Sequence, residues 1–245
     1  MKKMNTITIF DKEVSFYSEA ASRIARGILQ KRDAVVGLST GRTTKHIHGK
    51  LAEIIGSLKI DTSHVTFFGV DEVVGVPKTY SGACYTMLRT ELLDTLGIDE
   101  DHFLMLPTSV AAYPEACRRF TDALGRLGGI DILMLGLGEN GHLGFNQPGT
   151  PFGSTAWLSE MDPELDARIH KETATPDSQR LGGATLGLKD IMRARRIILV
   201  ANGERKAAIV RRMLRGPVTP DVPASILQLH PNCEYLLDAE AAKQL

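Results

Sequence analysis

Residues 132–137 read Ile-Leu-Met-Leu-Gly-Leu, and residues 138–149 directly after them read Gly-Glu-Asn-Gly-His-Leu-Gly-Phe-Asn-Gln-Pro-Gly. The first stretch is short and apolar without alternation, which predicts a strand buried on both faces. Strands of this kind are typical of parallel sheets, because helices cover both faces of such sheets. Similar runs predict further strands at residues 6–10, 34–38, 65–70, 197–200 and 235–237.

Stretches with helical periodicity separate these runs. They cover residues 14–31, 43–57, 81–95, 113–127 and 203–215. The alternation predicts an α/β fold, with a doubly wound, mostly parallel sheet of Rossmann-like type and helices on both of its faces. Because no linker rich in Pro, Gly or Ser divides the chain, we expect residues 1–245 to form a single domain.

The stretch 149–182 differs from the rest of the chain. It is polar, contains Pro151, Pro163 and Pro176, and lacks sustained periodicity. A long irregular segment inside a compact α/β protein is often a functional loop. We therefore predict an irregular lid segment here.

Charge and cysteine content narrow the class of protein. The 245 residues include 29 Lys and Arg against 29 Asp and Glu, so the formal net charge is zero. Nucleic-acid binders and membrane-surface proteins need a basic excess, so we expect neither partner. No apolar run reaches the roughly 18–20 residues of a membrane-spanning helix, and residues 1–14 contain no apolar signal core. Cys84, Cys117 and Cys233 lie far apart in the chain, which argues against a disulfide framework and predicts small buried side chains in a reduced, cytoplasmic protein.

Three segments follow predicted strands at their carboxyl ends, where ligands gather in open parallel sheets. The first contains Ser39, Thr40, Gly41, Arg42 and Thr43 and precedes a predicted helix. Hydroxyls and the N–H groups at a helix start suit an anion such as phosphate, although the spacing is not that of a Walker A loop. A plain helix cap by Ser or Thr is the alternative interpretation.

The second and third segments carry titratable groups. Asp71 and Glu72 follow the run at 65–70, where an acidic residue could be a general base, a metal ligand or the start of a loop. The third segment, residues 136–149, has five glycines with His142 at its centre. Histidine suits proton transfer near neutral pH, whereas a dinucleotide-binding fingerprint fits poorly because residues 146–149 break any helix. A loop histidine that caps the backbone is the alternative.

Other candidates are weaker. Lys206, in the predicted helix 203–215, could contact an anion, with an ordinary surface lysine as the alternative. His46 and His48 lie two apart and so face apart on a helix. No HExxH pair occurs in the chain, so we expect no metal site.

Taken in order, these segments resemble the glucosamine-6-phosphate deaminase/isomerase family, including its galactosamine-6-phosphate branch. Residues 136–148 match the family pattern GxGxxGHxxFNxP, and residues 71–77 match its acidic pair followed by a glycine and a proline. Residues 203–206 match a later Gly-x-x-Lys, and the tail at 226–231 is also similar. The resemblance covers nearly the whole chain.

The resemblance implies an enzyme that converts glucosamine 6-phosphate or galactosamine 6-phosphate to a ketose 6-phosphate and ammonia, without a redox cofactor. It implies that Asp71 moves a proton between C2 and C1, that His142 assists ring opening, and that residues 39–43 together with Lys206 bind the phosphate. The sequence leaves open whether the substrate has gluco or galacto stereochemistry and whether the chain forms a homo-oligomer.

This chain departs from the family pattern around His142. Gln147 stands where the family usually has an acidic residue, and Asn140 stands where many relatives have Asp. An amide can orient an imidazole but cannot stabilise imidazolium as a carboxylate does. The resemblance thus predicts a lower pKa for His142 than in relatives with flanking carboxylates. Arg168 and Lys171 are candidates for a second phosphate contact from the lid.

Two other functions compete with this reading. A 6-phosphogluconolactonase shares the fold and the loop, but its signature tends to have Arg after the acidic pair and GHxAS in the loop, where this chain has Val73 and Gly144-Phe145-Asn146. A non-catalytic sugar-phosphate sensor is suggested by Gln147 and Asn140. The presence of Asp71 and His142 argues against a sensor, because pure binding needs neither.

Overall fold

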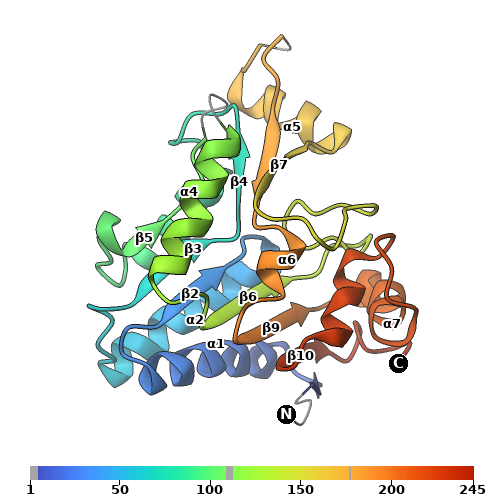
Figure 1. Cartoon of the computed structure of the whole chain (residues 1–245). Helices are drawn as coiled ribbons and strands as arrows, with labels where there is room; N and C mark the ends of the chain where they lie inside the picture. The colour runs from blue at the N-terminus through green and yellow to red at the C-terminus, as the bar shows by residue number, and fades with distance from the viewer. Residues whose placement is uncertain (1–4, 109–112, 177) are drawn as a thin grey trace.

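The computed structural model describes residues 5–108, 113–176 and 178–245. Its main sheet has seven strands, and every neighbouring pair in it is parallel, as the apolar runs predicted (Figure 1). Across the sheet the strands are β1 (Thr6–Phe10), β10 (Cys233–Asp238), β9 (Arg196–Ala201), β6 (Ile132–Gly136), β2 (Val35–Leu38), β3 (Thr66–Gly69) and β5 (Phe103–Leu104).

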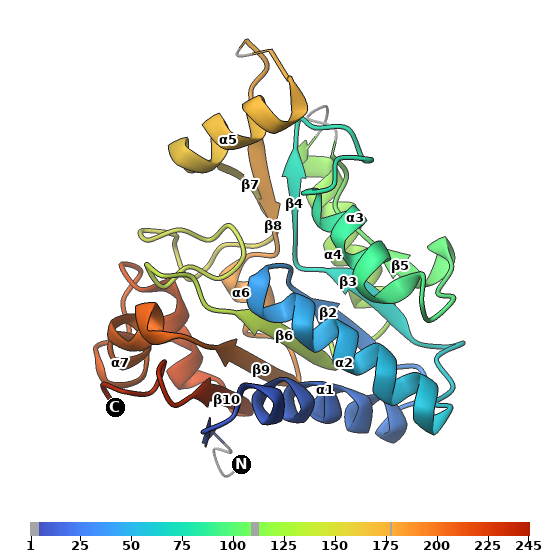
Figure 2. The same ribbon diagram turned by 180° about the vertical axis from the view of Figure 1, so that it is seen from behind.

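Helices cover both faces of this sheet. Helices α1 (Glu13–Gln30) and α2 (Arg42–Leu58) cover the face seen in Figure 2, and α4 (Tyr113–Arg126), α6 (Leu188–Ile191) and α7 (Ala207–Arg215) cover the other. Strand β6 shows why its sequence is apolar throughout. Ile132 and Met134 join the core beneath α1 and α2, whereas Leu133 and Leu135 join the opposite core. The predicted doubly wound α/β fold is therefore confirmed.

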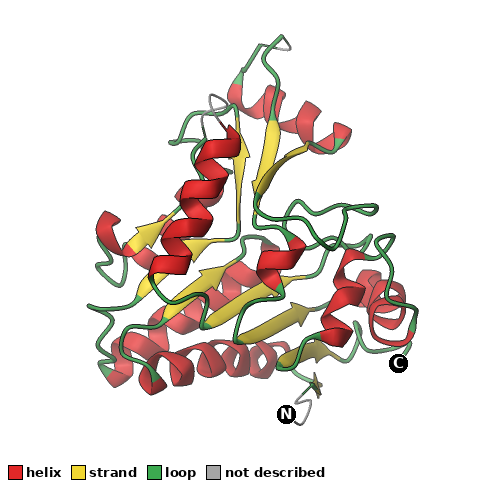
Figure 3. Ribbon diagram, viewed as in Figure 1, coloured by secondary structure: helices red, strands yellow, loops and turns green. Residues whose placement is uncertain are grey.

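A second, smaller sheet stands at the edge where the main strands end (Figure 3). It is antiparallel, with the order β4 (Asp71–Val74), β8 (Gly182–Thr185) and β7 (Trp157–Glu160). Only Val70 separates β4 from β3, so the chain passes directly from one sheet to the other. Helix α5 (Pro163–Thr173) packs on the small sheet through Ile169.

The expected irregularity of the stretch 149–182 is wrong, because this stretch contains β7 and α5. Strand β7 is held by pairing with β8, a partner remote in sequence. Helix α5 buries only Ile169, so its periodicity is weak, but its start is well marked. Asp162 caps it by accepting the N–H groups of Glu164 and Leu165, and Pro163 follows at the first position. Residue 177 of this stretch lies outside the described residues.

Two of the predicted helices are less regular than their periodicity suggests. The helix expected over 81–95 is α3 (Cys84–Leu88) continued by a π-helical turn (Arg89–Leu93). The helix expected over 203–215 begins with a 3₁₀ turn (Glu204–Lys206) before α7. Further 3₁₀ turns lie at Glu100–His102 and Pro223–Leu229. None of the described helices combines the length and the apolar character that crossing a membrane requires.

The strand order places the predicted site segments together. Strands β9, β6, β2 and β3 are neighbours in the sheet and run in the same direction. Their carboxyl ends therefore lie along one edge, which the small sheet and α5 face. The segments after these strands converge there: residues 202–203, 137–150, 39–41 and 70–71.

Candidate active site

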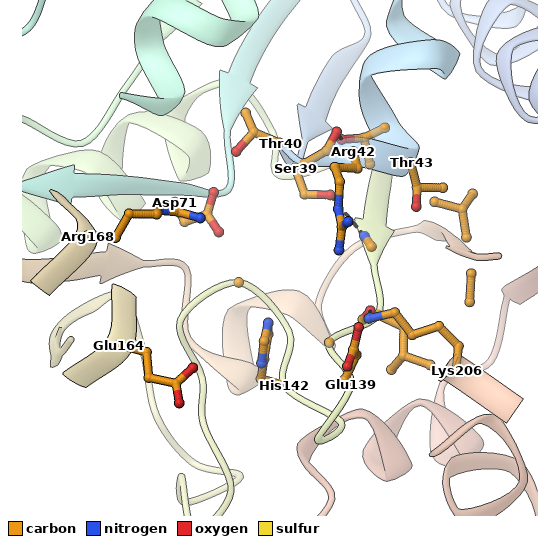
Figure 4. A pocket seen from close by; sticks show the side chains of 18 residues that line it. Ser39, Thr40, Arg42, Thr43, Asp71, Glu139, His142, Glu164, Arg168 and Lys206 are labelled. Carbon is orange, nitrogen blue, oxygen red and sulfur yellow. Dashed lines mark hydrogen bonds between the residues drawn. The ribbon is translucent and has the colours of Figure 1, made fainter. Parts of the chain in front are cut away.

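A cavity of about 570 Å³ opens at this edge of the sheet (Figure 4). Its walls include residues 39–44, Asp71, His142 and Lys206, which lie in segments that follow strands of the main sheet, together with Glu164 and Arg168 from α5. The fold thus brings all three predicted segments and Lys206 around one space. Asn140 and Gln147 support His142: Asn140 is hydrogen-bonded to the ring, and Gln147 is hydrogen-bonded to Asn140.

The start of α2 forms one end of the cavity. Gly41 precedes the helix with φ of 146°, a conformation that favours glycine, and no described side chain caps the helix start. The alternative of a plain cap by Ser or Thr is therefore wrong. The first N–H groups of a helix have no partner within it and carry positive partial charge. This end of the cavity is consequently suited to an anion.

The three hydroxyls predicted to bind phosphate are not equivalent. Ser39 Oγ accepts the N–H of Gly136 at 2.9 Å, which leaves its own hydrogen available. Thr40 Oγ1 donates to Cys84 Sγ at 3.2 Å, and Thr43 Oγ1 donates to Asn202 Oδ1 at 2.5 Å. The hydrogens of both threonines are thus engaged elsewhere, so these residues offer the cavity their backbone rather than their hydroxyls.

Cationic side chains lie at the same end and on the opposite wall of the cavity. Lys206 Nζ donates to the carbonyl oxygen of Leu137 at 2.7 Å and lines the cavity, so the surface-lysine alternative is wrong. Burial lowers the pKa of Lys206, with Arg42 acting in the same direction and Glu139 opposing. Arg168 reaches the cavity from α5, opposite the main sheet. Lys171 is not among the described residues that line it.

Asp71 and Glu72 have different environments. Glu72 is fully buried and accepts the N–H groups of Val73, Cys84 and Tyr85 at 2.7, 2.8 and 2.9 Å, so it anchors the start of α3. Burial raises the pKa of Glu72 to about 7, against the pull of these three donors. Asp71 instead lines the cavity and is 9% exposed. Burial raises its pKa to about 6, and a hydrogen bond from Cys84 opposes the rise.

These positions bear on the alternatives for the acidic pair. Asp71 begins strand β4, so the interpretation as the start of a loop is wrong. Among the described residues, no group of three His, Cys, Asp or Glu side chains is arranged to hold a metal ion. A carboxyl group with a pKa near neutrality, facing a cavity, is suited to a general base.

His142 is oriented through two amides. Asn140 Oδ1 accepts from the Nδ1 of His142 at 2.7 Å and from its backbone N at 3.1 Å, and Asn140 Nδ2 donates to Gln147 Oε1 at 2.9 Å. Because an amide oxygen can only accept, Nδ1 carries the proton and Nε2 is left as a base. Gln147 was expected to orient the imidazole directly; instead it fixes Asn140, and Asn140 holds the ring.

Burial also lowers the pKa of His142, with Lys206 acting in the same direction and Asp162 opposing. The lowered pKa of His142 has the direction that was predicted from its neutral neighbours, Asn140 and Gln147. The comparison with relatives that have flanking carboxylates stays a prediction.

Gly138 packs directly against the ring of His142. A methyl group at this position would lie 2.3 Å from Nδ1. We expect Gly138→Ala to displace the imidazole and to lower kcat roughly 10- to 100-fold, since a misplacement of about 1 Å can cost this much. Steady-state kinetics would measure the effect. Gly153→Ala is a matched control, because no described atom lies within 4 Å of a methyl there, and equal losses in both variants would contradict the expectation.

Two contributors to the site, Glu164 and Cys84, were missed in the sequence. Glu164 lies on α5 one helical turn before Arg168, which was already a candidate, and the Asp162-Pro163 start of that helix was the available signal. Cys84 was predicted to be a small buried side chain. It is buried, but its sulfur also lies between Thr40 and Asp71, a contact that no local pattern announces.

Comparison with known proteins agrees with this geometry. Residues 13–235 match the profile of glucosamine-6-phosphate isomerases and 6-phosphogluconolactonase. The glucosamine-6-phosphate deaminase of Bacillus pumilus is 32% identical over 238 residues, which are 97% of this chain and 98% of that protein. The corresponding enzyme of Clostridium acetobutylicum is 31% identical over 243 residues, 99% of this chain and all of its own length.

Solved structures show the same similarity. A monomeric glucosamine-6-phosphate deaminase superposes with a TM-score of 0.90 at 28% identity, covering 98% of this chain and 100% of that one. The 6-phosphogluconolactonase of Trypanosoma brucei has a TM-score of 0.76 at 22% identity, with both chains fully covered, which shows a common fold. The chain therefore belongs to the family of glucosamine-6-phosphate isomerases and 6-phosphogluconolactonases.

Proposed function

We propose that this protein is an amino-sugar-phosphate deaminase, which converts a hexosamine 6-phosphate and water into a ketose 6-phosphate and ammonia. The observation that carries the proposal is the shared cavity: an anion site lies at one end, and Asp71 and His142 line the same space. The relatives named glucosamine-6-phosphate deaminase, which align over nearly the full chain, support the substrate class.

The phosphate binds at the start of α2. The backbone N–H groups of residues 42–44 and the Ser39 hydroxyl donate to it, while Arg42 and Lys206 supply positive charge. Arg168 on α5 contacts the phosphate from the opposite side of the cavity. The stretch 149–182, which contributes both Arg168 and Glu164 to the cavity, acts as a lid. A phosphate held at C6 fixes the position of the rest of the sugar, which converts proton transfer into a positioned step.

We assign the opening of the sugar ring to His142. Its free Nε2 takes the proton of the C1 hydroxyl as the ring C–O bond breaks, and the same proton is then delivered to the ring oxygen, which becomes the C5 hydroxyl. Asn140 and Gln147 keep the imidazole in the tautomer that this step needs. The product of this step is the open-chain aldehyde.

Asp71 performs the isomerisation. Its carboxylate removes the proton at C2, which gives an enolamine, and returns a proton to C1, which leaves an imine at C2. Water adds to this imine, and ammonia leaves. Hydrogen moves between adjacent carbons with no net oxidation, so we propose that the reaction uses no cofactor. We further propose a single domain and a cytoplasmic location.

The pKa of Asp71 sets the acid side of the pH dependence. A protonated carboxyl cannot remove the C2 proton, so kcat/KM is expected to fall as the pH drops through about 6, the value to which burial raises this pKa. A carboxyl with an ordinary pKa would place the fall near pH 4. Ammonia release measured between pH 4.5 and 8.5 at limiting substrate would locate the midpoint, and a midpoint below pH 5 would contradict this assignment.

Gln147→Glu tests the neutral surroundings of His142. The new carboxylate can still accept from Asn140 Nδ2, and its charge should raise the pKa of His142. We expect a histidine NMR titration to show this rise and kcat to increase severalfold if the neutral amide limits ring opening. Gln244→Glu, a change at an exposed residue near the end of the chain, controls for added negative charge. An unchanged His142 titration would show that position 147 does not influence the ring.

A panel of three substrates tests the function itself. The purified chain is incubated with glucosamine 6-phosphate, galactosamine 6-phosphate and 6-phosphogluconolactone, and ammonia, ketose phosphate and acid are followed. Ammonia together with ketose phosphate is expected from one or both amino sugars. Acid release from the lactone alone would overturn the proposal in favour of a lactonase, and binding without turnover of any would indicate a sensor.

A further inference from the structure

Cys84 lies beneath the proposed base at the first position of α3 and is 5% exposed. Its sulfur is 3.5 Å from Asp71 Oδ1, and it accepts the hydroxyl hydrogen of Thr40 at 3.2 Å. We propose that Cys84 is a positioning residue, whose S–H group, aligned by Thr40, donates to Oδ1 of Asp71 and turns Oδ2 toward the substrate. The proposal rests on the proposed function only in assigning the proton transfer to Asp71.

The direction of the hydrogen bonds follows from the partners. The sulfur of Cys84 already accepts from Thr40, so the thiol hydrogen is free to point at Asp71. An ionised carboxylate has no hydrogen to donate, so Asp71 must be the acceptor in this contact. Burial, with the nearby charges of Asp71 and Glu72, holds the pKa of Cys84 well above its usual range. The group therefore remains S–H across the pH range in which Asp71 titrates.

The backbone of Cys84 is fixed independently of its side chain. Its N–H donates at 2.8 Å to Oε1 of Glu72, the residue next to Asp71 on β4. The second oxygen of Asp71 faces Gly144, where a methyl group would lie 3.3 Å from Oδ2, and Gly144 lines the cavity. Oδ1 of Asp71 is thus held by the Cys84 thiol, and Oδ2 faces the cavity in which we propose that the substrate binds.

Other titratable and charged groups also surround Asp71. Glu72 is adjacent on β4, His142 lies in the loop after β6, and α5 presents Glu164 and Arg168 to the same cavity. At the other end of the cavity are Arg42, Glu139 and Lys206. The test must therefore change the hydrogen bond while leaving all of these groups in place.

The variants Cys84→Ala and Cys84→Ser, made in the full chain, change this hydrogen bond and leave the other charged groups in place. Alanine removes the donor that favours ionised Asp71, so the acid limb of kcat/KM should move to higher pH, with kcat/KM below the midpoint about 3–10-fold lower. Serine keeps a donor, so its acid limb should stay at or below that of the wild type. Cys117→Ala is the matched control, because it also empties a buried thiol site, in the core beneath α4. Identical acid limbs in the alanine and serine variants would overturn the proposal.

An infrared measurement tests the hydrogen bond between Cys84 and Asp71 independently of enzymatic activity. The S–H stretching band that disappears in Cys84→Ser should move to lower frequency when Asp71 ionises, and Asp71→Asn should abolish this pH dependence. A band that does not respond to pH would overturn the proposal even if Cys84→Ala fails to fold. A responsive band in a protein that releases no ammonia would instead reject the proposed function and leave the positioning contact standing.

Discussion

Asp71→Asn is expected to lower kcat for ammonia release by about 10²–10⁴-fold, the usual contribution of a positioned general base. Asparagine has nearly the same shape but cannot take the C2 proton. KM should change little, because the proposed phosphate site, at residues 39–44 and Lys206, lies at the other end of the cavity. Steady-state kinetics with glucosamine 6-phosphate would measure both parameters.

Two controls accompany this variant. Exchange of the C2 hydrogen with deuterated solvent should be lost together with ammonia release, because both need the same base. Stability should not suffer at pH 8: burial raises the pKa of Asp71 from 3.8 to about 6, so its ionised form destabilises the folded state above about pH 6, by up to about 3 kcal/mol, and this cost is absent below pH 4. Activity retained within tenfold would remove Asp71 from the mechanism.

His142→Asn should reduce kcat by about 10²–10³-fold, because ring opening would then depend on the uncatalysed reaction in the bound sugar. The binding of an acyclic amino-alditol 6-phosphate, which has no ring to open, should stay within about threefold of the wild type. Calorimetry would measure that binding and a coupled ammonia assay the rate.

His64→Asn serves as the matched control for His142→Asn, since His64 is exposed on the surface before β3. Its rate should equal that of the wild type. If His142→Asn weakened the acyclic ligand as strongly as it lowered kcat, the histidine would be a binding residue, and the assignment to ring opening would fail.

The main sheet was predictable because each buried strand has a local signature. The apolar runs identified six of its seven strands, and the two-residue strand β5 is too short to show a pattern. The small sheet was not predictable in the same way. Strand β8 reads Gly-Gly-Ala-Thr, which has no apolar pattern, and its four residues are buried through contacts remote in sequence: β4 and β7 pair on either side of it, and Phe145 packs against Gly183.

The candidate site was likewise predictable only in part. Residues at the ends of parallel strands must share one edge, so the meeting of Asp71, His142 and the loop before α2 could be expected from the sequence. The donors within that loop could not be ranked, because the partners of Thr40 and Thr43 are Cys84 and Asn202, which are 44 and 159 positions away.

The sequence by itself determined the α/β class, the edge at which the site lies and the chemical types gathered there, because periodicity and strand direction are local properties of the chain. Only the tertiary structure decided which of two adjacent carboxylates faces the cavity. Asp71 and Glu72 point to opposite faces of a strand, and Glu72 is buried against α3, where it accepts two N–H groups in addition to that of Val73. Tertiary packing likewise turned a thiol without any local signature toward Asp71, since hydrogen-bond partners remote in sequence are selected only when the chain is folded.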